Sequence, residues 1–139
     1  MRALEYGVQI AKKFKSRITL IYVYQHMYPV AVSPVMYGSL PYESSFPPEL
    51  VPEFAKAARK DGTAVLAQGE KLAKSKGAQA ELVLKNGHPV EEILKTAEQE
   101  KFDLIVMGAR GLSTIKKIVL GSVSHGVTTH APCPVLIVR

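Results

Sequence analysis

The segment DLIVMGARG at residues 103–111, followed by GSVS at residues 121–124, decides the fold. Asp103 to Met107 is an apolar run with β-branched residues and is too short for a typical helix, so it predicts a fully buried strand. Gly108 and Gly111 then remove side chains that would keep a ligand from the backbone. They also permit positive φ, so that consecutive amide N–H groups can converge on an anion. The end of this strand is therefore a candidate phosphate site.

A second group of amides follows at the start of a helical pattern. Ser122 to His130 is predicted as a helix, and Gly121 and Ser122 lie at its N-terminus. Unsatisfied N–H groups and the positive end of the helix dipole favour a phosphate there. Taken singly, the two loop glycines are also consistent with a plain turn, and Ser122 with a plain helix N-cap. Two such groups beside one strand end can hold two parts of a polyphosphate.

The rest of the chain alternates between helical and strand patterns. An open parallel sheet with helices on both faces is therefore expected, because parallel neighbours need crossover connections. In such α/β sheets, ligands bind beyond the carboxyl ends of the strands. The predicted helices begin near Met1, Glu53, Pro89 and Ser122, and the predicted strands span 18–24, 80–85, 103–107 and 134–138.

Composition limits the classes of protein that remain. The 139 residues suit a single domain over 1–139, with 47% hydrophobic and 22% charged residues, as in globular proteins. No apolar run approaches the length of a membrane span and no signal peptide is evident, so the cytoplasm is the expected compartment. The net charge of +6 comes from lysines spread along predicted helices, which does not indicate nucleic-acid binding. Cys133 is the only cysteine and is expected to be a small buried residue.

Residues 25–52 form the least regular part of the sequence. Six prolines alternate with aromatic residues and Met36, which excludes a continuous helix or a central strand. The segment is interpreted as a long loop that folds onto the body or onto a partner subunit. A mobile linker is the alternative.

The motif Gly, two residues, Gly, nine residues, Gly-Ser resembles the signature of the ATP-binding branch of the universal stress protein family. Nearly the whole chain shares the resemblance, including Leu20 to Val23, Asn86 to Ile93 and the closing run Ala131 to Val138. The family implies a Rossmann-like fold and a homodimer joined through last strands like Pro134 to Val138. An exposed apolar edge strand is also a physical reason for pairing, because its free N–H and C=O groups need partners.

The resemblance implies an adenine-nucleotide site that binds ATP, with or without Mg²⁺. In relatives that bind ATP, the backbone at the position of Val23 faces adenine, and the remaining positions surround the nucleoside and phosphates. Arg110 supplies a positive charge inside the motif. With Arg110 added for its charge, the predicted nucleotide-binding residues are Val23, Met107, Gly108, Arg110, Gly111, Gly121, Ser122, Val123 and Ser124.

The sequence departs from the family pattern at its start. Family members begin with a strand that ends in an acidic residue, whereas this sequence begins with the helical pattern of Met1 to Lys15. By family topology that strand is central, so its loss leaves unpaired backbone groups in the middle of the sheet. Three explanations are open: the chain is truncated or its start is mis-assigned, neighbouring strands close the gap, or another subunit contributes a strand. Adenine recognition is expected to be weaker.

Two functional classes follow. The first is a dimeric stress-response or signalling protein that binds ATP, which the glycine spacing favours. The second is a dimeric interaction module of the same fold that binds no nucleotide, which the absent strand favours. Catalysis beyond slow ATP hydrolysis is not indicated, because no nucleophile is paired with a base, no metal-ligand cluster is present, and the Walker glycine-lysine motif is absent. No catalytic or metal-ligating residue is predicted.

Overall fold

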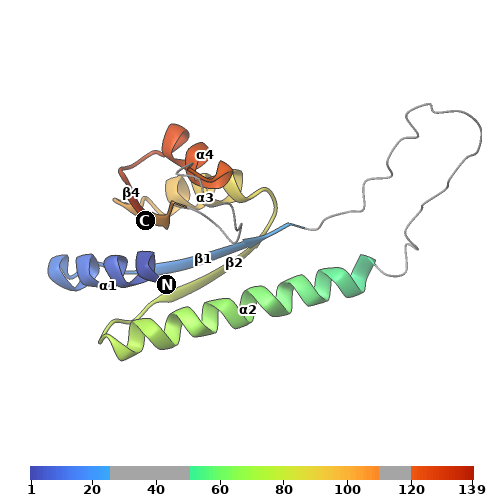
Figure 1. The fold of residues 1–139 in the computed structure, drawn as a ribbon, viewed down its shortest axis with the longest axis horizontal. Coiled ribbons are helices and arrows are strands. Elements are labelled where there is room, and N and C mark those ends of the chain that lie inside the picture. The colour runs from blue at the N-terminus through green and yellow to red at the C-terminus, as the bar shows by residue number, and fades with distance from the viewer. Residues whose placement is uncertain (26–50, 110–119) are drawn as a thin grey trace, which may run out of the picture.

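The computed structural model describes residues 1–25, 51–109 and 120–139. Helices and strands alternate along the chain (Figure 1). Both strand pairings found among these residues are parallel, which confirms the α/β class. The elements are α1 (Arg2–Phe14), β1 (Thr19–Tyr24), α2 (Val51–Ser75), β2 (Glu81–Asn86), α3 (Pro89–Gln99), β3 (Ile105–Gly108), α4 (Ser122–His130) and β4 (Val135–Val138).

The first helix starts without a side-chain cap. Met1 is the N-cap residue and makes no capping hydrogen bond, as the sequence predicted, because neither Met1 nor Arg2 has a short polar side chain. The helix ends at Phe14, and its C-cap residue Lys15 has the left-handed φ of 53°. Val8 and Ala11 are buried, so α1 is held by its packing against the body rather than by its start.

The second helix ends at a glycine. Gly77 has a φ of +75°, and its N–H donates to the C=O of Lys74 at 2.9 Å. The N–H of Ala78 donates to the C=O of Ala73 at 3.0 Å. These two bonds satisfy carbonyls that the end of the helix leaves without partners. The prediction that Gly77 closes this helix is confirmed.

Replacing Gly77 with alanine is expected to lower the free energy of unfolding by about 1 kcal/mol, because a Cβ is disfavoured in the left-handed region. Urea denaturation measures the change. The nearest atom to the added Cβ would be the Lys12 Nζ at 3.5 Å, so backbone strain rather than a steric clash causes the loss. An unchanged midpoint would show that the left-handed turn is not needed.

The strands form two separate parallel pairs, β1 with β2 and β3 with β4. The predicted single open sheet is therefore interrupted. Helix α2 packs against β1 and β2, whereas α3 and α4 pack against each other on the opposite side (Figure 1). Among the described residues β1 and β3 are not hydrogen-bonded to each other, so neighbouring strands do not close the gap. The helices still lie on both sides, as expected for this class of fold.

The prediction that the strand after Asp103 is fully buried was wrong. All four residues of β3 are only partly buried. The cause is the interruption itself, since one edge of β3 pairs with β4 and the other is paired with no strand among the described residues. Within the described ranges, no helix is both long enough and apolar enough to cross a membrane.

Candidate functional site

The structure joins the end of β3 to the start of α4 through two hydrogen bonds. The hydroxyl of Ser124 donates to the C=O of Gly108 at 2.8 Å, and the N–H of Gly121 donates to the C=O of Ala109 at 2.9 Å. Ser124 is 3% exposed. The two ends of the glycine motif, 12 residues apart from Ala109 to Gly121 in the sequence, are therefore held side by side.

The first turn of α4 has amide donors that precede its first helical hydrogen bond. Gly121 is its N-cap residue, with φ −64° and ψ 154°, and no side chain caps the helix. The first helical bond after the cap is from the His125 N–H to the Gly121 C=O, at 2.8 Å. The amides of Ser122, Val123 and Ser124 precede that bond and have no acceptor within the helix. Ser122 is exposed, whereas Ser124 is buried, so the positive end of the helix dipole reaches solvent at Ser122.

The backbone of Val23 is directed away from β2. At one end of this strand pair the Glu81 N–H donates to the Ile18 C=O at 2.9 Å, and at the other the Gly87 N–H donates to the Tyr24 C=O at 3.0 Å. In a parallel pair, alternate residues direct both backbone groups to the neighbouring strand. The even-numbered residues of β1 therefore bond β2, which leaves the N–H and C=O of Val23 on the opposite edge.

The other predicted site residues divide into two groups. Met107 lies in β3 opposite Ile137, and the register uses its backbone groups in the β3–β4 ladder, so only its side chain can contact a ligand. Gly108, Gly121, Ser122, Val123 and Ser124 lie together at the junction of β3 and α4. Val23 belongs to the other strand pair. Arg110 and Gly111 lie outside the described residues.

The Ser124 bond was not predicted from the sequence. The sequence feature that could have indicated this bond is a serine at the third position of α4, in a helix that starts beside the end of a strand.

Replacing Ser124 with alanine should leave the Gly108 carbonyl without this donor and lower the free energy of unfolding by about 1–3 kcal/mol. Thermal unfolding measures the loss. Thr129→Ala is the control, because the Thr129 hydroxyl donates to the His125 C=O at 2.9 Å on the exposed face of the same helix. An equal loss of stability in both variants would show that the Ser124 bond stabilises the fold no more than a bond within the exposed helix face does.

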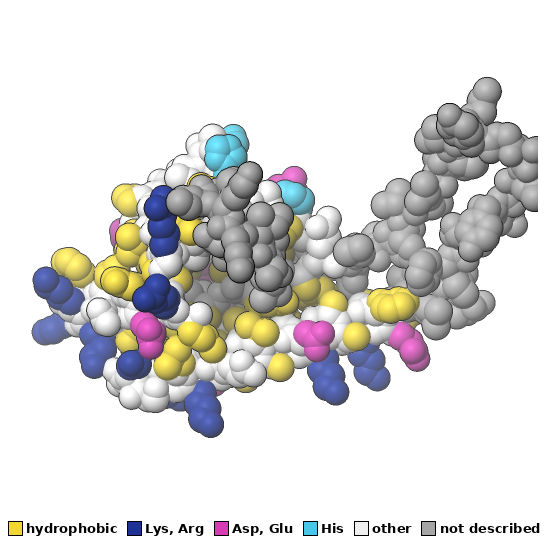
Figure 2. All heavy atoms as spheres, viewed as in Figure 1, with side chains coloured by type: hydrophobic (Ala, Val, Ile, Leu, Met, Phe, Trp, Pro, Cys, Tyr) yellow, Lys and Arg dark blue, Asp and Glu magenta, His cyan; other side chains and the backbone are white. Residues whose placement is uncertain are grey.

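Most of the positive charge of the described residues lies on solvent-exposed faces. The lysines predicted to be solvated (12, 13, 15, 56, 60, 71, 74 and 76) are all exposed. Lys and Arg side chains project outward from the helices over the face seen in Figure 2. Lys74 pairs with Glu70 at 2.7 Å, and Lys76 with Glu5 at 3.6 Å. No group of three or more potential metal-ligating His, Cys, Asp or Glu side chains is found among the described residues.

Cys133 is half-buried rather than fully buried, because the segment that leads into β4 lies at the surface. Burial raises the pKa of its thiol, the negative charge of Asp103 raises it further, and a backbone hydrogen bond with Ile105 acts in the opposite direction.

Iodoacetamide at pH 8 is therefore expected to alkylate Cys133 at least about twofold more slowly in the folded chain than in the urea-unfolded chain, since only the thiolate reacts. Asp103→Asn removes the repelling charge and should raise the rate in the folded chain. A folded chain that reacts as fast as the unfolded one would contradict the raised pKa.

Comparison with known proteins decides the family. The family model described as "Universal stress protein family" matches residues 1–139. The chain belongs to the universal stress protein family. The universal stress protein YxiE of Bacillus subtilis is 36% identical over 138 residues, which cover 99% of this chain and 89% of YxiE.

Solved structures of universal stress proteins have the same fold. The protein UspA from Lactobacillus plantarum superposes with a TM-score of 0.75 at 24% identity, over 99% of this chain and 88% of that one. A universal stress protein in complex with cAMP superposes with a TM-score of 0.65 at 27% identity, over 99% of this chain and 85% of that one. The α/β architecture of this universal stress protein thus agrees with that of its solved relatives.

Proposed function

We propose that this universal stress protein binds an adenine nucleotide, ATP in particular, and acts as a dimer in stress response or signalling. The observation that carries the proposal is the uncapped first turn of α4, which hydrogen bonds hold beside the end of β3. A relative at 27% identity has been solved in complex with cAMP. That likeness favours an adenine nucleotide over other anions.

The phosphate half of the site would lie at the junction of β3 and α4. The amides of Ser122, Val123 and Ser124 donate to phosphate oxygens, aided by the helix dipole. Gly108 and Gly121 leave space for a close approach to the backbone. Arg110 and Gly111 complete this half in the proposal, with Arg110 as the cation. Mg²⁺ would bind through the phosphates, because Mg²⁺ sites commonly combine few protein ligands with substrate phosphates.

The base half would use the free edge of β1. The N–H and C=O of Val23 form a neighbouring donor and acceptor. Adenine offers the complementary pair, because its ring nitrogen accepts a hydrogen bond and its exocyclic amino group donates one. The side chain of Met107 would pack against the nucleoside. Val23 and Met107 belong to different strand pairs, so the gap between β1 and β3 weakens this half.

The dimer would form through the outer edge of β4. In the β3–β4 ladder the Ile105 N–H donates to the Pro134 C=O at 3.0 Å, and the Ala109 N–H donates to the Val138 C=O at 2.8 Å. By the alternation of a parallel pair, Val135 and Ile137 direct their backbone groups away from β3. A second copy of the chain that pairs at this edge would satisfy them.

The alternative is an interaction module of the same fold that binds no nucleotide. The observation in its favour is the interruption between β1 and β3, which separates Val23 from the phosphate half. The two functions differ in a direct binding measurement.

Calorimetric titration with Mg-ATP, tripolyphosphate and adenosine tests the proposal. ATP is expected to bind with a Kd on the order of micromolar, tripolyphosphate about tenfold more weakly, and adenosine most weakly because the base half is the weaker one. Light scattering in the same buffer should give the mass of a dimer. A folded dimer that binds none of the three ligands would contradict nucleotide binding and favour the interaction module.

A further inference from the structure

The amino ends of β1 and β2 open onto a hollow of about 460 Å³. Two connections form its walls: residues 15–18, which lead from α1 into β1, and residues 77–80, which lead from α2 into β2. The first hydrogen bond between the two sides is from the Glu81 N–H to the Ile18 C=O, at 2.9 Å. The hollow therefore lies where the two strands have not yet paired, at the opposite end of the sheet from the proposed nucleotide site.

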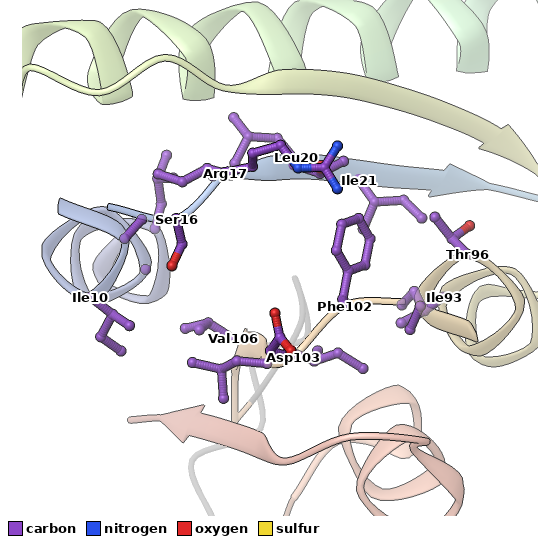
Figure 3. Close-up of a pocket in the computed structure, with 18 of the residues that line it drawn as sticks. Ile10, Ser16, Arg17, Leu20, Ile21, Ile93, Thr96, Phe102, Asp103 and Val106 are labelled. Atoms are coloured by element: carbon purple, nitrogen blue, oxygen red, sulfur yellow. The ribbon is translucent and has the colours of Figure 1, made fainter. Parts of the chain in front are cut away.

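Basic side chains line this hollow. Lys12, Lys15 and Arg17 belong to its lining, and all three are exposed. In Figure 2 dark blue side chains gather at the left-hand end of the molecule, where α1 and α2 end in Figure 1. Arg17 also lines the cavity between the two strand pairs, and Figure 3 shows it on the connection that enters β1. Two basic runs, KKFKSR at 12–17 and KLAKSK at 71–76, thus end at one edge of the sheet.

The electrostatics of the helix ends do not account for all of this charge. The carboxyl end of a helix carries about half a negative charge, which basic residues in the last turn offset. Lys12 and Lys13 do so in α1, and Lys74 does so in α2. Lys15 and Arg17 follow the last turn of α1 and form no ion pair among the described residues. Their positive charge is therefore in excess of what the helix ends offset.

The hollow is held in shape by contacts within the chain. The Lys12 ammonium donates to the Lys76 C=O at 2.8 Å, and the Lys76 ammonium pairs with Glu5 at 3.6 Å. Both contacts join the end of α2 to α1. The site is therefore formed before any ligand binds, and less binding energy is spent on ordering it.

The two walls differ in character. Lys12, Lys15 and Arg17 follow one another along the first wall, so a single small anion cannot contact all of them, whereas carboxylates spaced along a peptide can. The second wall has small side chains at residues 77, 78 and 80. Among the described residues, the N–H groups of Gln79 and Ala80 form no hydrogen bond. This wall therefore offers backbone donors to the carbonyls of an extended peptide.

We propose that this hollow is a docking site for an acidic, extended segment of a partner protein. The carboxylates of the segment pair with Lys15 and Arg17, and its backbone carbonyls accept hydrogen bonds from Gln79 and Ala80. None of the residues that line the hollow is aromatic, so the bases of a nucleic acid would find no ring on which to stack. The site is at the amino ends of the strands, so the proposal does not depend on nucleotide binding.

A synthetic peptide tests the site in the absence of nucleotide. The probe is a capped, fluorescent peptide of about eight residues in which serine and glutamate alternate, so that every carboxylate lies on one face of the extended chain. Fluorescence anisotropy at low salt should give a Kd below about 100 μM. Affinity should fall at least about tenfold in about 0.2 M salt, because exposed charges are screened. A peptide with glutamine in place of glutamate should bind at least about tenfold more weakly.

The double variant Lys15→Asn, Arg17→Gln tests the location. Asparagine tolerates the left-handed φ of 53° at position 15, so the end of α1 should be preserved. Affinity for the acidic peptide should fall at least about tenfold, whereas affinity for Mg-ATP should be that of the parent chain. Lys56→Gln, Lys60→Gln is the matched control, because it removes two exposed cations from the first half of α2. Its peptide affinity should stay within about twofold of the parent.

Glu81→Gln tests the charge of the hollow from the opposite direction. Glu81 is the acidic residue of the lining, so its neutralisation should tighten peptide binding about threefold. Equal losses in the two double variants would overturn the proposal, since net charge alone would then explain binding. So would a folded parent chain that fails to bind the acidic peptide at low salt, or a single-stranded oligonucleotide of equal charge that binds as tightly as the peptide.

Discussion

Replacement of Gly121 by aspartate is expected to weaken ATP binding at least about a hundredfold, or about 2.7 kcal/mol, without lowering the melting temperature. Gly121 is the N-cap residue of α4 and has an extended backbone with φ −64° and ψ 154°, which aspartate adopts readily. An aspartate there accepts hydrogen bonds from the first-turn amides and is a favourable N-cap. The same carboxylate repels the phosphates that would otherwise take these donors.

Gly121→Asn is the matched control for charge. Asparagine has nearly the same shape and caps a helix about as well as aspartate, but it carries no charge. Its loss of ATP affinity should be clearly smaller, about tenfold, because it competes for the amides without repelling the ligand. If Gly121→Asp binds ATP as tightly as the parent chain, the phosphates do not lie at the start of α4.

The second large effect is expected at Gly62, on the face of α2 that packs against the β1–β2 pair. A Cβ at this position would lie 2.7 Å from the Tyr22 Cδ1 and 2.8 Å from the Leu84 Cδ1. Both distances are far below van der Waals contact, and each neighbour belongs to a strand. Gly62→Leu should therefore lower the free energy of unfolding by about 3 kcal/mol, despite a gain in helix propensity of about 1 kcal/mol.

The same substitution at Gly7 should stabilise the fold rather than destabilise it. Gly7 is also in a helix, but its Cβ would meet only the Val106 Cβ at 3.9 Å and would face the cavity between the strand pairs. Gly7→Leu should raise the free energy of unfolding by about 1 kcal/mol, since helix propensity improves without a clash. Urea denaturation of both variants gives the comparison. Equal destabilisation at the two positions would show that the cavity is closed in solution.

Much of the fold could be predicted from the sequence, because each local signal agrees with its surroundings. The helix predicted from Ser122 to His130 has these bounds in the structure, since a glycine precedes it and Pro132 follows two residues after it. The close of α2 at Gly77 depends on one glycine with positive φ. The parallel pairing of strands followed from the alternation of helix and strand patterns.

The interruption of the sheet between β1 and β3 could not be predicted in the same way. An apolar run such as Ile105 to Met107 indicates a strand, but burial depends on the strands beside it. The sequence left open whether the strands on either side of the expected gap would close it. The structure leaves them apart, so β3 is half-buried. The tertiary bond between Ser124 and Gly108 was missed for a similar reason, because a serine in the first turn of a helix is equally typical of a solvent-exposed position.

The site residues remain a prediction from the motif and the resemblance. The structure adds two observations that bear on nucleotide binding. The amides at the start of α4 lack a side-chain cap, and the backbone of Val23 is directed away from β2. Whether the two halves bind one ligand depends on the space between β1 and β3.

Amide spectra of the ¹⁵N-labelled chain, recorded with and without saturating Mg-ATP, test nucleotide binding most directly. We expect shifts at Ser122, Val123 and Ser124 from the phosphates, and at Val23 from adenine. Tripolyphosphate should shift the three α4 amides and leave Val23 unchanged. Spectra in which ATP leaves the α4 amides unmoved, while the protein is folded, would contradict the proposed nucleotide site.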